Sequence, residues 1–459
     1  MDTANRHCHE ALAAKHPSVG THRNIGLFGI IELVRSHDPY VPMTGFNGTS
    51  DEMRAVGKHL RQNGLYTMVV NNAIHTNPPL CITEEQLGEA FQRGVHPPGC
   101  KHTADTPIRR LPFAPRLIVP LSQHIGKPSR PIVRVGEEVV RGQPIAASDG
   151  WLSVPQHAPA TGVVEAIELR PSARGPWTEC IVIRVYEAST QEVLWGTPQD
   201  IDAFPPQEIV LAVQRTGMVG LGGAAFPSHA KLTVPEGAKV ETLVVNGCEC
   251  EPYLTCDHRV MVEQARDLMV GIRHAMRATG ARRAIIGVED NKPAAAEAMR
   301  RALPSQGDIF VEKVPTKYPQ GSEKMLITAL FGVEVPSGKL PLSLGMVVNN
   351  VGTLAALGRL LPAGQGLVER VVTVTGPGVA RPGDYRVPLG TPISFVLDYA
   401  GAPAQARQVI LGGPMMGQAI ASLDVPITKG VSGVLVFRHE DMAEREGRHT
   451  YPCIKCGEC

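Results

Sequence analysis

The clearest pattern along the chain is an alternation of short apolar runs with longer segments whose apolar residues recur every three to four positions. Apolar runs of this length predict buried strands, and the longer segments, two of which carry proline near their start, predict helices. The predicted strands are 239–247, 283–290 and 308–315, and the predicted helices are 205–217, 258–280 and 291–303. The alternation therefore predicts βαβ units in a mostly parallel sheet, whose ligands bind at the carboxyl ends of the strands.

The segment 116–170, which precedes this alternation, consists of short apolar stretches separated by glycines. VGEEVVRGQPI at 135–145 and APATGVVEAIE at 158–168 resemble a barrel-sandwich module of the biotinyl or lipoyl type. Glycine suits the tight turns of such a module because it tolerates backbone angles that other residues avoid. No lysine occurs between 154 and 162 to carry a swinging cofactor, so we expect a structural module.

The segment 369–401, after the alternation, predicts a short β-grasp-like unit with turns at 376–378 and 382–384. We therefore expect a multidomain chain that combines α/β and α+β parts. The expected divisions are a separate N-terminal segment at 1–92, the barrel-sandwich module at 93–200, a Rossmann-like parallel-sheet domain at 201–360, the β-grasp-like domain at 361–430 and a cysteine-bearing segment at 431–459.

The charge balance of the chain excludes some classes of partner. The 459 residues include 45 Lys and Arg against 44 Asp and Glu, a net charge of +1. This balance gives no global basic field to attract nucleic acid, and aromatic residues at 5% leave few stacking platforms for single strands. The first 30 residues lack the basic start and apolar stretch of a signal peptide. Uncharged apolar stretches fall short of the roughly 18 residues that a membrane-spanning helix needs, so we expect any membrane attachment to be peripheral.

Four motifs are rich in glycines or polar residues, of which the first directly follows a predicted helix and the second lies at the end of a predicted strand. They are 217–227 (GMVGLGGAAFP), 246–257 (NGCECEPYLTCD), 318–324 (YPQGSEK) and 348–353 (VNNVGT). The glycines of the first motif let backbone N–H groups approach a phosphate or a flat ring. Polar groups massed at the end of a strand are costly unless they meet a ligand, a metal or water. The second motif is therefore a candidate site.

Six of the ten cysteines fall in two clusters, which suits a reducing compartment where thiolates bind metal. The cluster at 248–256 could bind metal but lacks the familiar C-x2-C spacing. Cys453, Cys456 and Cys459 form C-x2-C-x2-C, the opening of a ferredoxin-type motif in which three thiolates face three irons of one cubane, with zinc as the alternative. Because the sequence ends at the third ligand of this motif, we expect a truncated chain.

Together, in this order and spacing, the four motifs resemble the flavin and NADH site of the NADH-binding subunit of complex I. The barrel-sandwich module and the terminal cysteines narrow the resemblance, over about 93–459, to the family of the C subunit of the Rnf ion-translocating oxidoreductase complex. The resemblance implies that 201–360 binds FMN and NADH, that 361–430 is a β-grasp-like SLBB domain and that 431–459 begins a 4Fe-4S ferredoxin-type domain.

The resemblance also implies roles for individual residues, none of them a catalytic side chain. The implied cofactor-binding residues are Gly222, Gly223, Ala224, Phe226, Asn246, Glu251, Tyr318, Gly321, Glu323, Asn349, Asn350 and Thr353, and the implied 4Fe-4S ligands are Cys453, Cys456 and Cys459. Phe226, Glu251 and Glu323 would lie near the nicotinamide, and the others would hold FMN or the dinucleotide. Ala225 stands where the family usually has glycine.

By this resemblance the chain is an electron-input subunit of a membrane-bound, ion-translocating ferredoxin:NAD oxidoreductase. It would move electrons between NAD(H), FMN and 4Fe-4S clusters, because a flavin accepts electrons in pairs and passes them on singly. The implied partners are membrane and soluble subunits of the Rnf complex, NAD(H) and ferredoxin, with no nucleic acid, at the cytoplasmic face of the bacterial inner membrane. Two alternatives remain open: a flavin and iron–sulfur cobalamin reductase of the propanediol-utilisation type, and a non-catalytic docking subunit.

Residues 1–92 resemble a different family, the class III pyridoxal-phosphate aminotransferases, in the C-terminal small domain. The resemblance rests on SVGTHRNIGLFGIIELV, NGLYTMVV and TNPPLCITEEQLGEAF. Thr83, followed by two glutamates, predicts the start of a helix in this segment. The large domain of that family, with its Schiff-base lysine, has no counterpart in this sequence, so aminotransferase activity does not follow. We expect either a fusion or a gene-model artefact.

Overall fold

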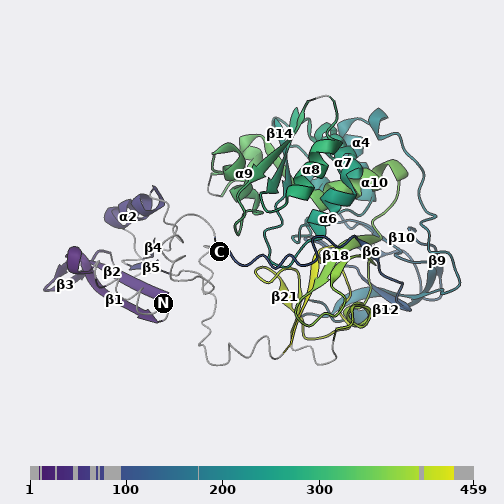
Figure 1. Cartoon of the computed structure of the whole chain (residues 1–459), viewed down its shortest axis with the longest axis horizontal. Coiled ribbons are helices and arrows are strands. Elements are labelled where there is room, and N and C mark those ends of the chain that lie inside the picture. The colour runs from purple at the N-terminus through teal and green to yellow at the C-terminus, as the bar shows by residue number, and fades with distance from the viewer. Residues whose placement is uncertain are drawn as a thin grey trace. The chain divides into compact units, whose positions relative to one another are not determined.

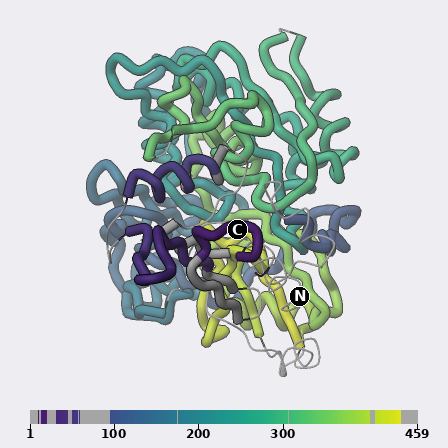
Figure 2. The backbone as a smooth tube through the Cα atoms, turned by 90° about the vertical axis from the view of Figure 1, so that its left-hand side faces the viewer, coloured from purple at the N-terminus to yellow at the C-terminus, as the bar shows by residue number. Residues whose placement is uncertain are grey.

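The computed structural model consists of two compact units (Figures 1 and 2). The smaller unit comprises Met1–Pro98 with Lys317–Pro319 and His449–Cys459, and the larger comprises Gly99–Thr316 and Gln320–Arg448. Within these units the structure describes residues 10, 13–25, 28–44, 50–62, 69–70, 73–76, 95–173, 175–305, 307–336, 338–402 and 408–438.

The smaller unit contains an antiparallel sheet and the helix α2 (Asp51–Gln62). The sheet has the order β1-β2-β5-β4, with β3 paired to β2. Its strands are β1 (Val19–Ile25), β2 (Phe28–His37), β3 (Tyr40–Pro42), β4 (Val69–Val70) and β5 (Ala73–Thr76). Met53 of α2 packs with Ile31 and Leu33 of β2 in an apolar cluster. The helix predicted to start at Thr83 lies outside the described residues.

Two small sheets form the barrel-sandwich module that the glycine-separated segment predicts. Their strand orders are β11-β10-β8 and β7-β13-β12-β9. The strands are β7 (Arg116–Pro120), β8 (Arg130–Pro131), β9 (Glu138–Val139), β10 (Pro144–Ala147), β11 (Gln156–His157), β12 (Gly162–Arg170) and β13 (Thr178–Val185). Ile145 of one sheet is fully buried with Ile181 and Ile183 of the other, so the two sheets share one core.

The α/β alternation produces a four-stranded parallel sheet with the order β16-β15-β14-β17, which confirms the predicted parallel sheet. Its strands are β14 (Thr242–Gly247), β15 (Arg283–Glu289), β16 (Ile309–Val314) and β17 (Met346–Asn350). Asn246 of β14 pairs with Asn350 of β17 and with Gly287 of β15. This register brings the carboxyl ends of the strands to one edge of the sheet.

Helices cover both faces of this sheet, as the upper part of Figure 1 shows. Leu243 and Val245 face a cluster formed with α7 and α10, whereas Val244 packs against Leu326 of α9, because successive side chains of a strand point to opposite faces. The helices are η1 (Ile201–Ala203), α4 (Pro206–Arg215), α5 (Ser228–Leu232), α6 (Cys256–Glu263), α7 (Ala265–Thr279), α8 (Pro293–Ala302), α9 (Glu323–Phe331), η2 (Pro341–Leu344) and α10 (Val351–Ala363). Among the described residues, none of the helices combines the length and apolarity required to cross a bilayer.

The prediction of a single helix over 258–280 is wrong, because two helices, α6 and α7, meet at Gln264. This residue has φ −121° and ψ 29°, outside the helical region. The start of α6 is fixed by a distant side chain, since the carboxylate of Glu249 accepts the N–H of Asp257 at 2.8 Å. Local apolar spacing carries no information about such a cap.

The last part of the larger unit is a mixed sheet with the order β21-β20-β22-β18-β19-β6. Its elements are β6 (Arg109–Arg110), β18 (Glu369–Thr375), β19 (Gly383–Pro388), α11 (Ile393–Ala400), β20 (Gln408–Leu411), β21 (Gln418–Ala419) and β22 (Gly433–Phe437). Strands β6 and β22 come from segments that the sequence assigned to the neighbouring divisions, 93–200 and 431–459. Yellow β22 and green β18 run side by side in Figure 2, because strand pairing follows contact in space rather than position in the chain.

Candidate functional site

The carboxyl edge of the parallel sheet brings together residues from three of the four sequence motifs. Asn246 lies near the end of β14, and its side-chain Nδ2 donates to the carbonyl of Gly321, which follows β16, at 2.8 Å. Asn350 ends β17 and pairs in register with Asn246. Gly321 is packed closely, since a Cβ there would lie 2.6 Å from the carbonyl oxygen of Cys248. The second, third and fourth motifs therefore form one site.

The first motif, the glycine-rich loop 217–227, is a tight hairpin between α4 and α5. The N–H of Gly220 donates to the carbonyl of Phe226 at 2.8 Å, which closes the loop. The tip is exposed, and Gly223 there has φ +108° with open space where a Cβ would be. Ala225 has φ +51°, in the left-handed region that favours glycine. The loop thus presents a bare backbone surface at its tip.

The loop contacts the start of α10. A Cβ on Gly222 would lie 3.3 Å from the side chain of Asn350. The N–H of Leu221 donates to the hydroxyl of Thr353 at 2.9 Å. These contacts place the tip of the glycine-rich loop at the same edge as Asn246 and Gly321, so the structure brings all four motifs together.

Asn350 caps α10 and is itself held in orientation. Its Oδ1 accepts the N–H of Thr353 at 3.2 Å, and its Nδ2 donates to the carboxylate of Asp257 at 2.6 Å. Burial, reinforced by nearby Glu249, raises the pKa of Asp257 to about 7. The N-terminus of a helix favours an anion, because its first N–H groups and its dipole both point outward. The start of α10 is thus suited to a phosphate.

Lys101 binds the backbone of the segment 248–254 through three hydrogen bonds. The Nζ of this lysine donates to the carbonyls of Glu249, Glu251 and Leu254 at 2.7, 2.8 and 2.6 Å. Burial lowers the pKa of Lys101. Sequence reasoning missed this residue, because no motif surrounds it and its partners lie about 150 positions further along the chain.

The two glutamates of this segment have different roles. The buried carboxylate of Glu249 accepts the N–H groups of Asp257 and His258 at 2.8 and 3.4 Å, so it caps α6. The carboxylate of Glu251 accepts the N–H of Met415 at 2.9 Å. Burial raises the pKa of Glu251, and its Oε1 has no hydrogen-bond partner among the described residues. Of the two carboxylates, Glu251 is the one with an oxygen left for a ligand.

Glu323, the first residue of α9, forms an ion pair with Lys231 of α5. The two side chains are 43% and 29% exposed, so both are accessible from solvent. Sequence reasoning singled out Glu323 and missed Lys231. The signal that could have found it is a cation on the short helix that directly follows the glycine-rich loop. Lys231 supplies positive charge near a loop suited to an anion.

Two of the remaining predicted residues are Tyr318, which belongs to the smaller unit, and Asn349, which lies near the end of β17 in the larger unit. Tyr318 is 3% exposed, and its backbone N–H and carbonyl each form a hydrogen bond of 2.7 Å with Val95. The side-chain amide of Gln320 and the Nδ2 of Asn349 are buried without a hydrogen-bond partner among the described residues. Buried groups of this kind cost about 1–3 kcal/mol each unless water or a ligand satisfies them.

The cysteines of the second motif have the environment of neutral thiols. Cys250 Sγ accepts the N–H of Gly321 at 3.3 Å, and burial raises the pKa of Cys250 to about 11. Burial also raises the pKa of Cys248, whose Sγ donates to the carbonyl of Gly287. In the part of the chain that the structure describes, no group of three His, Cys, Asp or Glu side chains is placed to hold a metal ion. Outside that part lie the predicted cluster ligands Cys453, Cys456 and Cys459.

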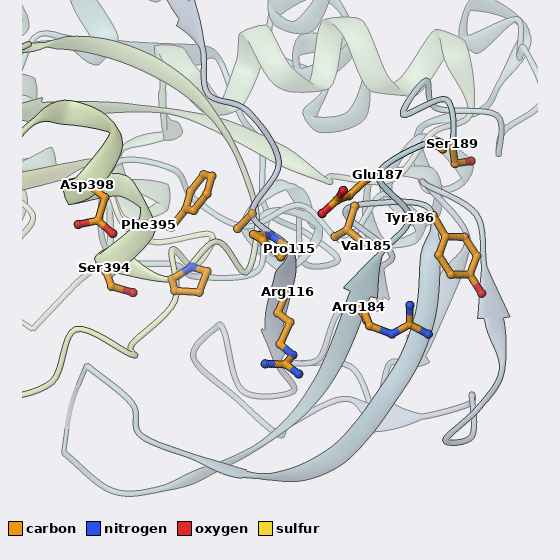
Figure 3. Close-up of a pocket in the computed structure, with 13 residues that line it drawn as sticks. Pro115, Arg116, Arg184, Val185, Tyr186, Glu187, Ser189, Ser394, Phe395 and Asp398 are labelled. Carbon is orange, nitrogen blue, oxygen red and sulfur yellow. The ribbon is translucent and has the colours of Figure 1, made fainter.

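A cavity of about 940 Å³ lies elsewhere in the larger unit, beside strands β7 and β13 and helix α11. In Figure 3 the side chains of Ser394, Phe395 and Asp398 lie on one side of it, with Arg184 and Tyr186 on the other. None of the predicted site residues lines it. The candidate site is therefore the edge of the parallel sheet.

Comparison with known protein families matches three regions of the chain. The Nuo51 FMN-binding domain matches residues 213–359, the RnfC barrel sandwich hybrid domain matches 89–187 and the SLBB domain matches 371–419. The C subunit of the Na⁺-translocating ferredoxin:NAD⁺ oxidoreductase complex of Acetobacterium woodii is 41% identical, over 80% of this chain and 83% of that protein. The C subunit of the proton-translocating ferredoxin:NAD⁺ oxidoreductase complex of Clostridium ljungdahlii is 39% identical, over 81% of each protein.

Solved structures give weaker similarities. An NAD⁺-reducing NiFe hydrogenase in the H₂-reduced state is 25% identical with a TM-score of 0.44, over 52% of this chain and 50% of that chain. A taurine:2-oxoglutarate aminotransferase from Bifidobacterium kashiwanohense is 30% identical with a TM-score of 0.19, over 20% of each chain. Both TM-scores are too low to support a statement about this fold. The resemblance of residues 1–92 to aminotransferases stays a prediction.

Proposed function

Because the chain belongs to the family of the C subunits of Rnf ion-translocating oxidoreductase complexes, we propose that it is the electron-input subunit of such a complex. It would be an oxidoreductase subunit that moves electrons between NAD(H), FMN and 4Fe-4S clusters. The observation that carries this proposal is the meeting of the glycine-rich loop with Asn246, Gly321 and Asn350 at one edge of the parallel sheet.

The residues at this edge fit FMN. The exposed tip formed by Gly222, Gly223 and Ala224 would lie against the ring or the dinucleotide, since the space beside Gly223 is open. Among the described residues, the side-chain nitrogen of Asn349 is buried without a hydrogen-bond partner, and an oxygen of the ligand would satisfy it. The start of α10, capped by Asn350, would favour the phosphate. FMN supplies the ability to take electrons from a nicotinamide in pairs and to release them singly.

We place the nicotinamide beside the remaining residues of the site. One carboxylate oxygen of Glu251 has no hydrogen-bond partner among the described residues. Glu323 is partly exposed in its ion pair with Lys231. Phe226, which is half-buried at the end of the glycine-rich loop, would pack against the nicotinamide, and Tyr318 would help to hold the flavin.

The electron acceptor and the partners complete the proposal. Cys453, Cys456 and Cys459 would bind a 4Fe-4S cluster, because their spacing brings three thiolates to one cubane. The partners would be the membrane and soluble subunits of the complex, with ferredoxin as the electron partner of the whole assembly. The chain would attach peripherally to the cytoplasmic face of the bacterial inner membrane.

The test is a titration of the flavin-free full chain with FMN, followed by NADH under anaerobic conditions. We expect FMN fluorescence to be quenched at one equivalent and the bound flavin to bleach when NADH is added. Asn246→Ala should weaken FMN binding, because it removes the group that fixes Gly321, whereas Gln207→Ala on the exposed face of α4 should not. A wild-type chain that binds no FMN, or binds it without reduction by NADH, would refute the proposal.

A further inference from the structure

A buried lysine contacts the start of the glycine-rich loop, although it lies outside residues 213–359, which match the FMN-binding family. Lys429, between β21 and β22, has no exposed surface. Its Nζ donates to the carbonyl of Gly217, the first residue of the loop, at 2.7 Å and to the carbonyl of Pro155 at 3.1 Å. Both acceptors are backbone carbonyls, so in the described part of the chain no carboxylate bonds to this group. A lysine in such a place costs stability and calls for a functional reason.

The residues around Lys429 extend its contact along the whole loop. The carbonyl of Lys429 accepts from the guanidinium of Arg370, whose Nη2 donates to the carbonyl of Leu221 at 3.1 Å. A Cβ on Gly430 would lie 3.3 Å from the Cβ of Ala225. Residues 429–430 therefore contact the start and the end of the glycine-rich loop, and Arg370, which is bonded to Lys429, contacts its middle.

The groups that face Lys429 leave its charge unbalanced. His157 of β11 and His124, which precedes β8, lie near it, and Arg370 of β18 is a second cation. Burial first and Lys429 second lower the pKa of His157 to about 3 and of His124 to about 4, so both rings are neutral at pH 7. Burial lowers the pKa of Lys429 to about 7.

We propose that Lys429 is a positioning residue, whose side chain holds loop 217–227 in the shape that receives the flavin. That the held loop receives a flavin rests on the proposed function, whereas the holding of the loop is a property of the flavin-free chain. Lys429 and Arg370 both lie outside the residues 213–359 that match the FMN-binding family. The flavin site therefore includes support from the C-terminal sheet.

The first experiment measures hydrogen exchange of the amides at 217–227 in the flavin-free full chain. Lys429→Met leaves the carbonyls of Gly217 and Pro155 without their donor, and we expect loop exchange to speed up by at least about tenfold. Lys292→Met is the matched control, because Lys292 is also buried but its Nζ pairs with Glu289 rather than with a carbonyl of the loop. Lys429→Arg keeps a charged donor and should exchange more slowly than Lys429→Met. Loop exchange in Lys429→Met that matches the wild type would overturn the proposal.

The second experiment measures the FMN affinity of the full chain. Because a loosened loop must be restored when the flavin binds, Lys429→Met should bind FMN at least about fivefold more weakly than the wild type, and Lys429→Arg should lie between them. Equal affinities of Lys429→Met and the wild type would overturn the proposal. A wild-type chain that binds no FMN refutes the proposed function instead, and loop exchange then decides the role of Lys429 alone.

Discussion

Thr353 carries the hydroxyl that accepts the N–H of Leu221 at 2.9 Å, at the contact between the glycine-rich loop and α10. The residue is 1% exposed, so water cannot replace the hydroxyl if it is removed. Thr353→Val keeps the shape of the side chain but substitutes a methyl group for the acceptor. An N–H left buried without an acceptor costs about 1–3 kcal/mol. We expect the free energy of unfolding of Thr353→Val to fall by an amount in that range.

The same cost should appear in flavin binding if the loop relaxes in the free protein and must be restored in the complex. Each 1.4 kcal/mol changes a dissociation constant about tenfold, so Thr353→Val should bind FMN about 5- to 150-fold more weakly. The assay is FMN fluorescence quenching on the full chain, with melting of the flavin-free chain followed by circular dichroism. Thr353→Ser retains the hydroxyl and should stay close to wild type in FMN affinity. If Ser and Val weaken FMN binding equally, the hydrogen bond to Leu221 is not what holds the loop.

Three further outcomes follow from the same contacts. Gly321→Ala should abolish FMN binding in the same titration, since its Cβ would lie 2.6 Å from a backbone oxygen, whereas Gly99→Ala, with its nearest atom at 3.6 Å, should bind normally. Lys101→Met leaves three carbonyls without a donor, so its unfolding free energy should fall by more than about 3 kcal/mol, and an unchanged melting temperature would contradict this. Burial raises the pKa of Asp384 from 3.8 to about 7, so the folded chain keeps a proton that the unfolded chain has lost. Stability should therefore fall as the pH rises through this range, and urea unfolding of Asp384→Asn should show a flatter dependence; equal slopes would argue against it.

The local pattern of the sequence predicts most elements of the α/β part. The apolar runs at 239–247 and 283–290 became β14 and β15, because a strand buried on both faces needs an apolar run, and the segment 308–315 became the partly exposed edge strand β16. Strand β17 was not predicted from such a run. The break between α6 and α7 at Gln264 was missed, since it depends on the backbone angles of that residue, which apolar spacing does not encode.

The residues of the site also divide into those that the sequence predicted and those that only the structure showed. Sequence placed Asn246 at a strand end, whereas only the structure showed that Asn350 ends the neighbouring strand β17 and lies at the same edge of the parallel sheet. The resemblance selected Glu251 and not Glu249, but only the structure shows that Glu249 caps a helix and that, among the described residues, one carboxylate oxygen of Glu251 has no hydrogen-bond partner. The sequence also gave no sign of Lys101 or Lys429, because their partners are carbonyl oxygens, which every residue has.

The order of residues alone therefore determined the type of most elements in the α/β part, the parallel arrangement and the strand end where polar residues gather, because these follow from local periodicity and from the direction of the chain. Only the tertiary structure decided which charged groups support that edge and which strands join the C-terminal sheet. Lys429 donates to Gly217, 212 positions away, and β6 pairs with β19 from the far end of the larger unit. Such pairs form because buried polar groups and strand edges must find partners in space, and distance along the chain does not limit which partner they find.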